Sequence, residues 1–247
     1  MQIFEPFIWG FDDLEAIFFM TLLLLLYFAD IPYLGNEVPF YLCRMTRKIW
    51  LAGQVVYIVC ATAIYTVAIL LSTILICGQR CYVGNIWSET AVKLAFTSAG
   101  KKLSLAASEK TLELTRPYAC MTTIFFLLFA YALVMVLLIF WFRILWNELA
   151  GMIAGVVFNG ISFIFSPGIL QKLLGISERK SYLANVAAGW ISPLSHATYH
   201  LHNFGYDRLP SLRDSGIYDM VLVIMLIVLN LYSIRTYHFV FDGTGER

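Results

Sequence analysis

Long runs without charged residues set what this chain can fold into. No Asp, Glu, Lys or Arg occurs in residues 16–29, 49–79, 117–142 or 149–171. A further apolar run, residues 217–241, admits only Asp219 near its start and Arg235 near its end. A helix needs about 20 apolar residues to cross a bilayer, and a charge at its centre costs roughly 2.5–3.5 kcal/mol. The runs therefore indicate a multi-pass helical membrane protein.

The composition supports the same class and excludes another. Hydrophobic residues make up 60% of the 247 residues and charged residues 13%, whereas a soluble domain carries about 25% charged residues. The formal net charge is +1. Nucleic-acid binding requires a dense basic face, so we expect no nucleic-acid partner.

We predict an all-α fold in which residues 1–247 form a single transmembrane domain. The predicted spans cover about residues 11–29, 50–76, 117–142, 149–165 and 217–239. The longer connections, residues 77–116 and 166–215, are predicted to be external. Acidic residues precede the first span, with no basic segment and no cleavage site of small residues, so we do not expect a cleaved signal peptide.

The positive-inside rule predicts the orientation of the spans, because Lys and Arg in short loops stay in the cytoplasm. The short loops and the C-terminal tail carry Arg44, Arg47, Lys48, Arg143, Arg235 and Arg247. We therefore place residues 30–50, the turn "RILWNE" and the C-terminus in the cytoplasm. Five spans then leave the N-terminus outside.

Residues 30–50, "DIPYLGNEVPFYLCRMTRKIW", are unusually basic for a connection between two spans. Asn36 suits a helix N-cap and Pro39 a first helical turn, so a short helix is predicted over residues 36–49. One interpretation is an interfacial helix whose basic side chains reach lipid phosphates. The other is a docking helix for a cytoplasmic partner. The residues alone leave both open.

A wider pattern around this helix resembles a known family. It consists of Asp30, Pro32, Pro39, Phe40, Arg44, Arg47, Lys48, Trp50, Gly53, Gln54 and Tyr57. The pattern, which covers about 30 residues, resembles the coupling-helix region of bacterial ABC-2-type transporter permeases. The order of spans and loops over most of the chain is also similar to that family.

The resemblance implies a function, a location and partners. It implies a permease subunit of an ATP-driven exporter in the bacterial cell membrane, which works with a second permease subunit. A separate ATP-binding subunit would carry ATP and Mg²⁺, and this chain would hold no cofactor. The coupling residues that it implies are Glu37, Pro39, Phe40, Arg44, Arg47, Lys48 and Trp50. The family normally has six spans, so a first span is expected to be missing here or supplied by another subunit.

The chain contains no G-x-x-x-x-G-K-[ST] sequence, the phosphate-binding loop of many ATPases. We therefore expect the chain not to be an enzyme itself. One alternative function is a membrane scaffold or sensor subunit. Another is an intramembrane serine protease with Ser162 as nucleophile and His196 or His200 as base, although the residues flanking Ser162 do not suit an exposed nucleophile.

Small residues mark a helix-packing surface in the fourth predicted span. Gly151 and Gly155 have GxxxG spacing, and Gly160 follows. Small residues let helix backbones approach closely in a membrane. Packing within the chain and contact with a second subunit are both compatible with the pattern.

The external segments carry two further features. Residues 181–206 contain no Asp, Glu, Lys or Arg but are too polar and too interrupted by Pro193 to span, so we predict a re-entrant pair of short helices. Its histidines, His196, His200 and His202, lack a nearby carboxylate in the sequence, and no metal site is expected. Cys77 and Cys81 could form a disulfide, but two free thiols are the favoured interpretation.

Overall fold

The computed structural model describes residues 1–32, 44–78, 81–97, 100, 108–173, 175 and 177–237. Within these residues every regular element is helical, apart from an isolated bridge between Gln2 and Tyr82. The α-helices are α1 (Glu5–Phe11), α2 (Leu14–Tyr27), α4 (Arg47–Cys77), α5 (Glu89–Phe96), α7 (Glu109–Leu114), α8 (Pro117–Leu145), α9 (Glu148–Ile164), α10 (Pro167–Leu173), α11 (Ser181–Ile191), α12 (Pro193–Ala197) and α13 (Leu212–Ser233). Short 3₁₀ turns cover Glu178–Lys180 and Tyr199–Leu201. The predicted all-α fold is confirmed for the described part of the chain.

Three helices are long and apolar enough to cross a membrane. They are α4 with 31 residues, α8 with 29 and α13 with 22. A fourth candidate is the pair α9 and α10, which is bent by 71° at the break between the two helices. The described residues thus contain three or four candidate spans, where the sequence predicted five.

The first predicted span, residues 11–29, corresponds to one short helix, α2, which a second short helix, α1, precedes. Helix α1 ends at Phe11, and α2 begins at Leu14. The Asp13 side chain caps α2 by accepting a hydrogen bond from the backbone N–H of Ala16, as acidic residues commonly do at helix starts. With 14 residues, α2 is only about 21 Å long, which is less than the thickness of a hydrocarbon core.

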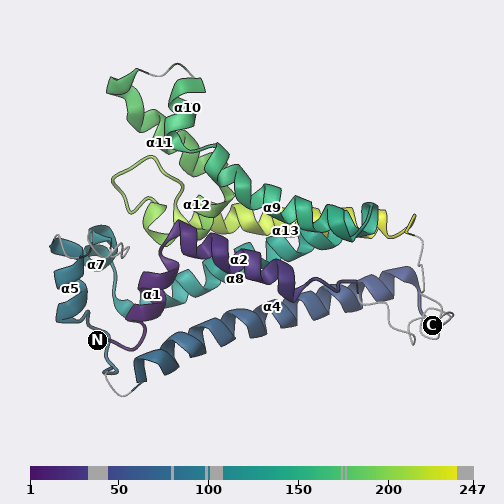
Figure 1. The fold of residues 1–247 in the computed structure, drawn as a ribbon, viewed down its shortest axis with the longest axis horizontal. Helices are drawn as coiled ribbons and strands as arrows, with labels where there is room; N and C mark the ends of the chain where they lie inside the picture. The colour runs from purple at the N-terminus through teal and green to yellow at the C-terminus, as the bar shows by residue number, and fades with distance from the viewer. Residues whose placement is uncertain are drawn as a thin grey trace.

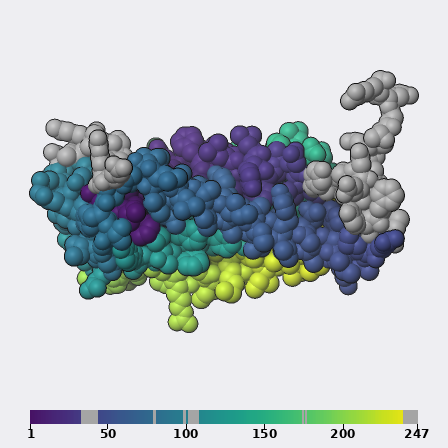
Figure 2. Space-filling model, turned by 90° about the horizontal axis from the view of Figure 1, so that it is seen from below, coloured from purple at the N-terminus to yellow at the C-terminus, as the bar shows by residue number. Residues whose placement is uncertain are grey.

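Helix α8 is the central element of the bundle. It packs against α4, α9 and α13, and also against α1, α2 and α12. In its most apolar window, 61% of the residues are buried, compared with 22% in α4 and in α13. Figure 2 shows α4 exposed along the length of the molecule, between α2 and α13. The outer faces of α4 and α13 are apolar, with Ile64, Leu75 and Met220 more than 60% exposed, as helices that face lipid require.

Local sequence signals explain where the long helices begin. Thr46 caps α4, Asn147 caps α9, and Pro117 occupies the first turn of α8. Ser211 and Asp214 form a capping box at the start of α13, each side chain bonding the backbone of the other residue. The predicted spans at residues 50–76, 117–142, 149–165 and 217–239 correspond to α4, α8, α9 and α13, with ends shifted by at most six residues.

The long connections contain helices of their own. Residues 77–116 include α5 and α7, and residues 166–215 include α10, α11 and α12. Figure 1 shows α10 and α11 side by side, projecting from the bundle. The predicted break at Pro193 separates α11 from α12. Helix α12 packs against α2, α8 and α9, and all five of its residues are buried.

Candidate functional site: the basic end of the bundle

The ends of four helices, and the chain that follows α2, meet at one end of the molecule, which we call the basic end. It comprises residues 28–32, 44–50, 143–148 and 233–237: α8 and α13 end there, α4 and α9 begin there, and residues 28–32 follow α2 (Figure 1). The cationic residues there are Arg44, Arg47, Lys48, Arg143 and Arg235. The flanks of residues 33–43, the segment predicted to couple to a partner, both lie at this end.

Arg47 joins the start of α4 to the end of α13. Its Nη1 atom donates to the carbonyl oxygens of Arg235 at 2.6 Å, Tyr237 at 3.1 Å and Ile234 at 3.3 Å. These carbonyls follow the last turn of α13, where backbone acceptors lack partners within the helix. A cation at a helix C-terminus also interacts favourably with the helix dipole, by about 0.3–1 kcal/mol. Arg47 is therefore an electrostatic clamp between two candidate spans.

Trp50 strengthens the same junction. Its ring stacks on the ring of Tyr237, with centroids 6.5 Å apart and planes inclined by 14°. Trp50 is buried, whereas Arg44, Arg47 and Lys48 are exposed. Two residues of the sequence pattern, Arg47 and Trp50, thus contact the same short stretch after α13, residues 234–237.

Arg143 makes a second clamp at this end. It lies near the end of α8 and donates through Nη1 to the carbonyls of Phe28, Ala29 and Ile31, which follow α2. The bond to Ala29 is 2.6 Å long. Arg143 is only 4% exposed, so these bonds offset part of the cost of burying its charge. The chain that enters residues 33–43 is thereby fixed to α8.

A small pocket lies between the end of α2 and α4. It has a volume of about 330 Å³ and is lined by Tyr27, Asp30, Ile31, Gln54 and Tyr57. Asp30, Gln54 and Tyr57 belong to the sequence pattern that resembles the permease family. The structure therefore brings together residues of that pattern that lie on both sides of the predicted coupling helix.

The predicted coupling helix over residues 36–49 needs a correction at its end. Arg44 to Thr46 are not helical, and α4 begins at Arg47. Arg47, Lys48 and Ile49 therefore belong to the long helix, because Thr46 caps its first turn. Glu37, Pro39 and Phe40 lie outside the residues that the structure describes.

The glycines of α9 have two different environments. A Cβ atom at Gly155 would lie 2.6 Å from Leu25 Cδ2 of α2 and 3.2 Å from Ile139 Cγ1 of α8. At Gly151 it would meet the Arg143 side chain and the Ile139 carbonyl oxygen. Both residues pack within the chain. At Gly160 it would meet nothing within 4 Å among the described atoms.

The opposite end of the molecule holds a buried polar cluster around the histidines. Ser215 Oγ lies 2.8 Å from both His196 Nδ1 and His202 Nε2. The remaining ring nitrogens face the carbonyls of Trp190 and Tyr199. Burial lowers the pKa of His196 and of His202, which favours neutral rings. Ser215 was not identified from the sequence, because a serine in the first turn of a helix carries no distinctive signal.

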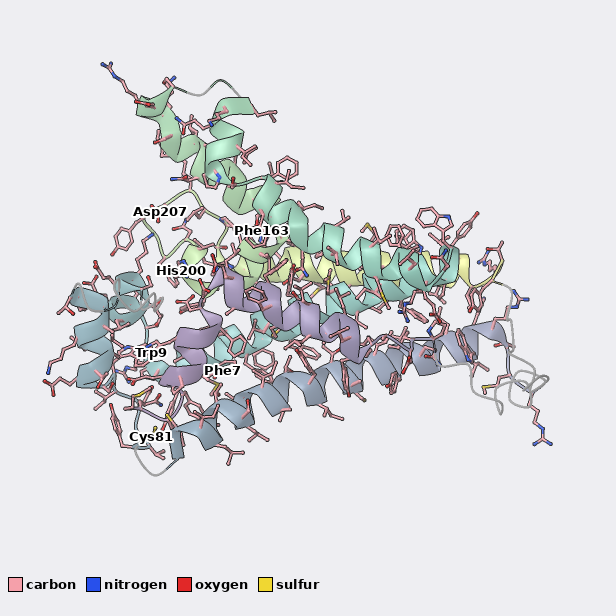
Figure 3. All side chains as sticks on the ribbon, viewed as in Figure 1. Phe7, Trp9, Cys81, Phe163, His200 and Asp207 are labelled. Atoms are coloured by element: carbon pink, nitrogen blue, oxygen red, sulfur yellow. The ribbon has the colours of Figure 1, made fainter. Side chains whose placement is uncertain are left out.

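Asp12 organises a second polar cluster at that end, which includes His200 (Figure 3). Its carboxylate accepts from the backbone N–H of His200 at 2.7 Å and from Thr111 Oγ1 at 3.2 Å. His200 Nδ1 lies 3.1 Å from Asp12 Oδ1. Burial lowers the pKa of His200, but the hydrogen bonds and charge of Asp12 outweigh this effect and the net shift is upward. The carboxylate absent near the histidines in sequence is thus supplied from 188 residues away.

The geometry does not assemble the residues of the serine protease alternative. Ser162 Oγ accepts from the backbone N–H of Leu194 at 3.0 Å. Both ring nitrogens of His196 are bonded elsewhere, and His200 binds Asp12. Among the described residues no group of three or more His, Cys, Asp or Glu could hold a metal ion. Cys77 and Cys81 are free thiols.

Comparisons of the chain with models of protein families, with curated proteins and with solved structures find no match. The resemblance to ABC-2-type permeases therefore depends on the sequence pattern and the order of its elements.

Proposed function

We propose that the chain is a membrane-spanning permease subunit of an ATP-driven exporter of the ABC-2 type. In this proposal the chain lies in a bacterial cell membrane with its C-terminus in the cytoplasm. The segment from Glu37 to Trp50 binds a separate ATP-binding subunit, which carries ATP and Mg²⁺. A second permease subunit completes the transporter.

The observation that carries the proposal is the clamp at the basic end. A partner that pushes on residues 37–46 pushes directly on the start of α4. Because Arg47 and Trp50 bind the residues after α13, that displacement reaches a second candidate span without an intervening loop. Arg143 fixes the other flank of the segment to α8. A segment attached to several helices can convert ATP-driven closure of the ATP-binding subunits into movement of those helices.

The buried share of each helix suggests how the movement is divided. Helix α8 is held on several sides, whereas α4 and α13 pack mainly on one side of it. We therefore expect α8 to remain fixed while α4 and α13 tilt together. This is rigid-body movement about a packed interface, in which access to a central path alternates between the two sides of the membrane.

The first test is purification of the tagged full chain from its own membranes in mild detergent, with mass spectrometry of the proteins that accompany it. We expect a protein with a G-x-x-x-x-G-K-[ST] sequence. Absence of such a protein, under conditions that retain other membrane complexes, would contradict the exporter and favour a scaffold or sensor subunit.

Two pairs of variants separate docking from coupling. Arg44→Glu should weaken binding of the ATP-binding subunit by roughly tenfold, because it reverses an exposed charge at the proposed contact. Arg179→Glu, which changes an exposed arginine at the opposite end, is its control.

Arg47→Met should retain the partner but lower transport per ATP hydrolysed, since it removes the clamp on α13. Arg179→Met, an exposed position outside the proposed docking segment, is the matched control, and equal transport per ATP in both methionine variants would contradict the lever.

A further inference from the structure

A pocket of about 430 Å³ lies at the junction of α9 and α10 and is also lined by residues of α11 and α12. Its apolar walls include Phe163, Phe165, Ala188, Leu201 and Leu209. Pockets for small ligands measure about 300–1,000 Å³ and are mostly apolar with a few placed polar groups. None of the described residues that line this pocket is charged, so it offers no counter-ion to an ionised ligand.

Four serines line this pocket, and three of them are more than nine-tenths buried: Ser162, Ser192 and Ser195. Ser162 Oγ accepts from the backbone N–H of Leu194, and Ser192 Oγ accepts from that of Ser195. The structure gives no acceptor for the hydroxyl protons of these serines among the described residues. A buried donor without an acceptor costs about 1–3 kcal/mol. A ligand that places acceptor oxygens beside these hydroxyls would therefore bind more tightly.

The pocket continues toward a more polar one. Asn185 and Leu209 line both this pocket and a neighbouring pocket of about 460 Å³. In the second pocket Lys110 Nζ forms an ion pair of 2.5 Å with Asp207. Figure 3 shows Phe163 and Asp207 on either side of this region. A ligand with an apolar chain among the aromatic residues would place its head beside the polar pocket.

We propose that the inner pocket binds the acyl-ester portion of an uncharged amphiphile, a monoacylglycerol-type lipid. The apolar walls take the acyl chain, and the serine hydroxyls donate to the ester oxygens. An ionised carboxylate is disfavoured at the serines, because no charged residue lines the inner pocket and burial of a charge without a counter-ion is costly. The proposal does not depend on the exporter: its test measures binding to this chain alone, so its failure would leave the exporter proposal unchanged.

The experiment uses the purified full chain in lipid nanodiscs with a photoactivatable monoacylglycerol that carries a diazirine in its acyl chain. Covalent labelling is quantified and mapped by mass spectrometry of peptides. We expect labels on residues that line the pocket, such as Phe163 and Leu201. Monolaurin should compete with the probe, and laurate, which is ionised at neutral pH, should compete at least about tenfold less well.

Ser195 provides the matched variants, because its hydroxyl makes no hydrogen bond that the structure records among the described residues. Ser195→Ala removes a donor and retains the volume, and should weaken labelling by about fivefold, as loss of one neutral hydrogen bond does. Ser195→Leu fills the pocket and should abolish labelling. Ser72→Ala and Ser72→Leu, on the exposed face of α4, should label as the wild type does.

The outcomes are distinguishable. Size-exclusion profiles and Tm values show whether each variant is folded. If Ser195→Leu does not fold, Ser195→Ala still tests the proposal. Wild-type labelling of Ser195→Leu, labels only outside the pocket, or equal competition by laurate would overturn the proposal. With the ATP-binding subunit present, ATP-dependent movement of the bound probe identifies an exported lipid, and retention of the probe identifies a resident one.

Discussion

Asn159 lies within the candidate span α9, and its amide is bonded by two neighbouring helices. Its Oδ1 accepts from Tyr131 Oη of α8 at 2.6 Å, and its Nδ2 donates to Thr21 Oγ1 of α2 at 3.0 Å. All three side chains are at most 1% exposed. Hydrogen bonds between membrane helices contribute about 0.6–2 kcal/mol each. These residues were not singled out from the sequence, because an isolated Asn, Thr or Tyr in an apolar run does not reveal its partner.

The pair of Asp12 and His200 gives a prediction of pH dependence. The pKa of His200 is raised in the folded state, above an unfolded value of about 6.5. The folded state therefore binds the proton more tightly, and the stabilisation is fully present below about pH 6.5 and lost as the pH rises through the folded pKa. His200→Gln should lower Tm more at about pH 5.5 than at about pH 8.5. A loss of Tm that is the same at both pH values would contradict the ion pair.

Helix ends, more than helix interiors, determine the arrangement of elements. Asp12 and Asp13 separate α1 from α2, and Asn147 permits the tight turn from α8 to α9. Arginines then bind the carbonyls that α2 and α13 leave unpaired. Each of these contacts satisfies backbone groups that are costly to leave unpaired in an apolar environment.

Helix α9 offers a matched pair of glycines for a prediction at the scale of the element. Gly155→Leu should destabilise the bundle by about 1–3 kcal/mol, because the added side chain meets Leu25 and Ile139. Gly160→Leu should change stability little, since nothing lies within 4 Å of its Cβ position among the described residues. Unfolding in detergent measures both variants. Equal destabilisation by the two substitutions would contradict the packing of α2 on α9.

The whole molecule is a bundle with two chemically different ends. The basic end carries the arginine clamps, and the opposite end carries the histidine clusters, α10 to α12 and the pocket with the serines (Figure 1). Between the two ends, α4 and α13 expose apolar side chains. We propose that the basic end faces the cytoplasm, because its Lys and Arg residues lie in short connections, whereas those of the opposite end lie in the two long ones.

Single cysteines at the two ends test this orientation. In a chain whose native cysteines have been replaced, Arg179→Cys should react with a membrane-impermeant thiol reagent on intact cells. Arg235→Cys, at the basic end, should react only after the membrane is permeabilised. Labelling is read from the mass of the purified protein. The reverse pattern would show that the basic end is external and would contradict docking of a cytoplasmic ATP-binding subunit.

The sequence by itself determined the class of the protein and the positions of its long helices. Charge-free runs identify α4, α8, α9 and α13 because the cost of a charge in an apolar environment acts on each segment separately. Caps such as Asn147 and Ser211 are also local signals, but they were not used in the prediction, and α13 begins at Leu212, five residues before its predicted start. The start of the first predicted span was placed three residues before Leu14, because the capping side chain of Asp13 was not used in the prediction.

Only the tertiary structure decided which polar groups meet. Arg47 binds carbonyls 187 to 190 residues away, and Asp12 binds a histidine 188 residues away. Such contacts depend on the packing of α8 against its neighbours, which brings distant helix ends together and excludes water from them. Sequence patterns report the preferences of single segments, whereas the clamps, the histidine clusters and the pocket exist only once those segments are packed.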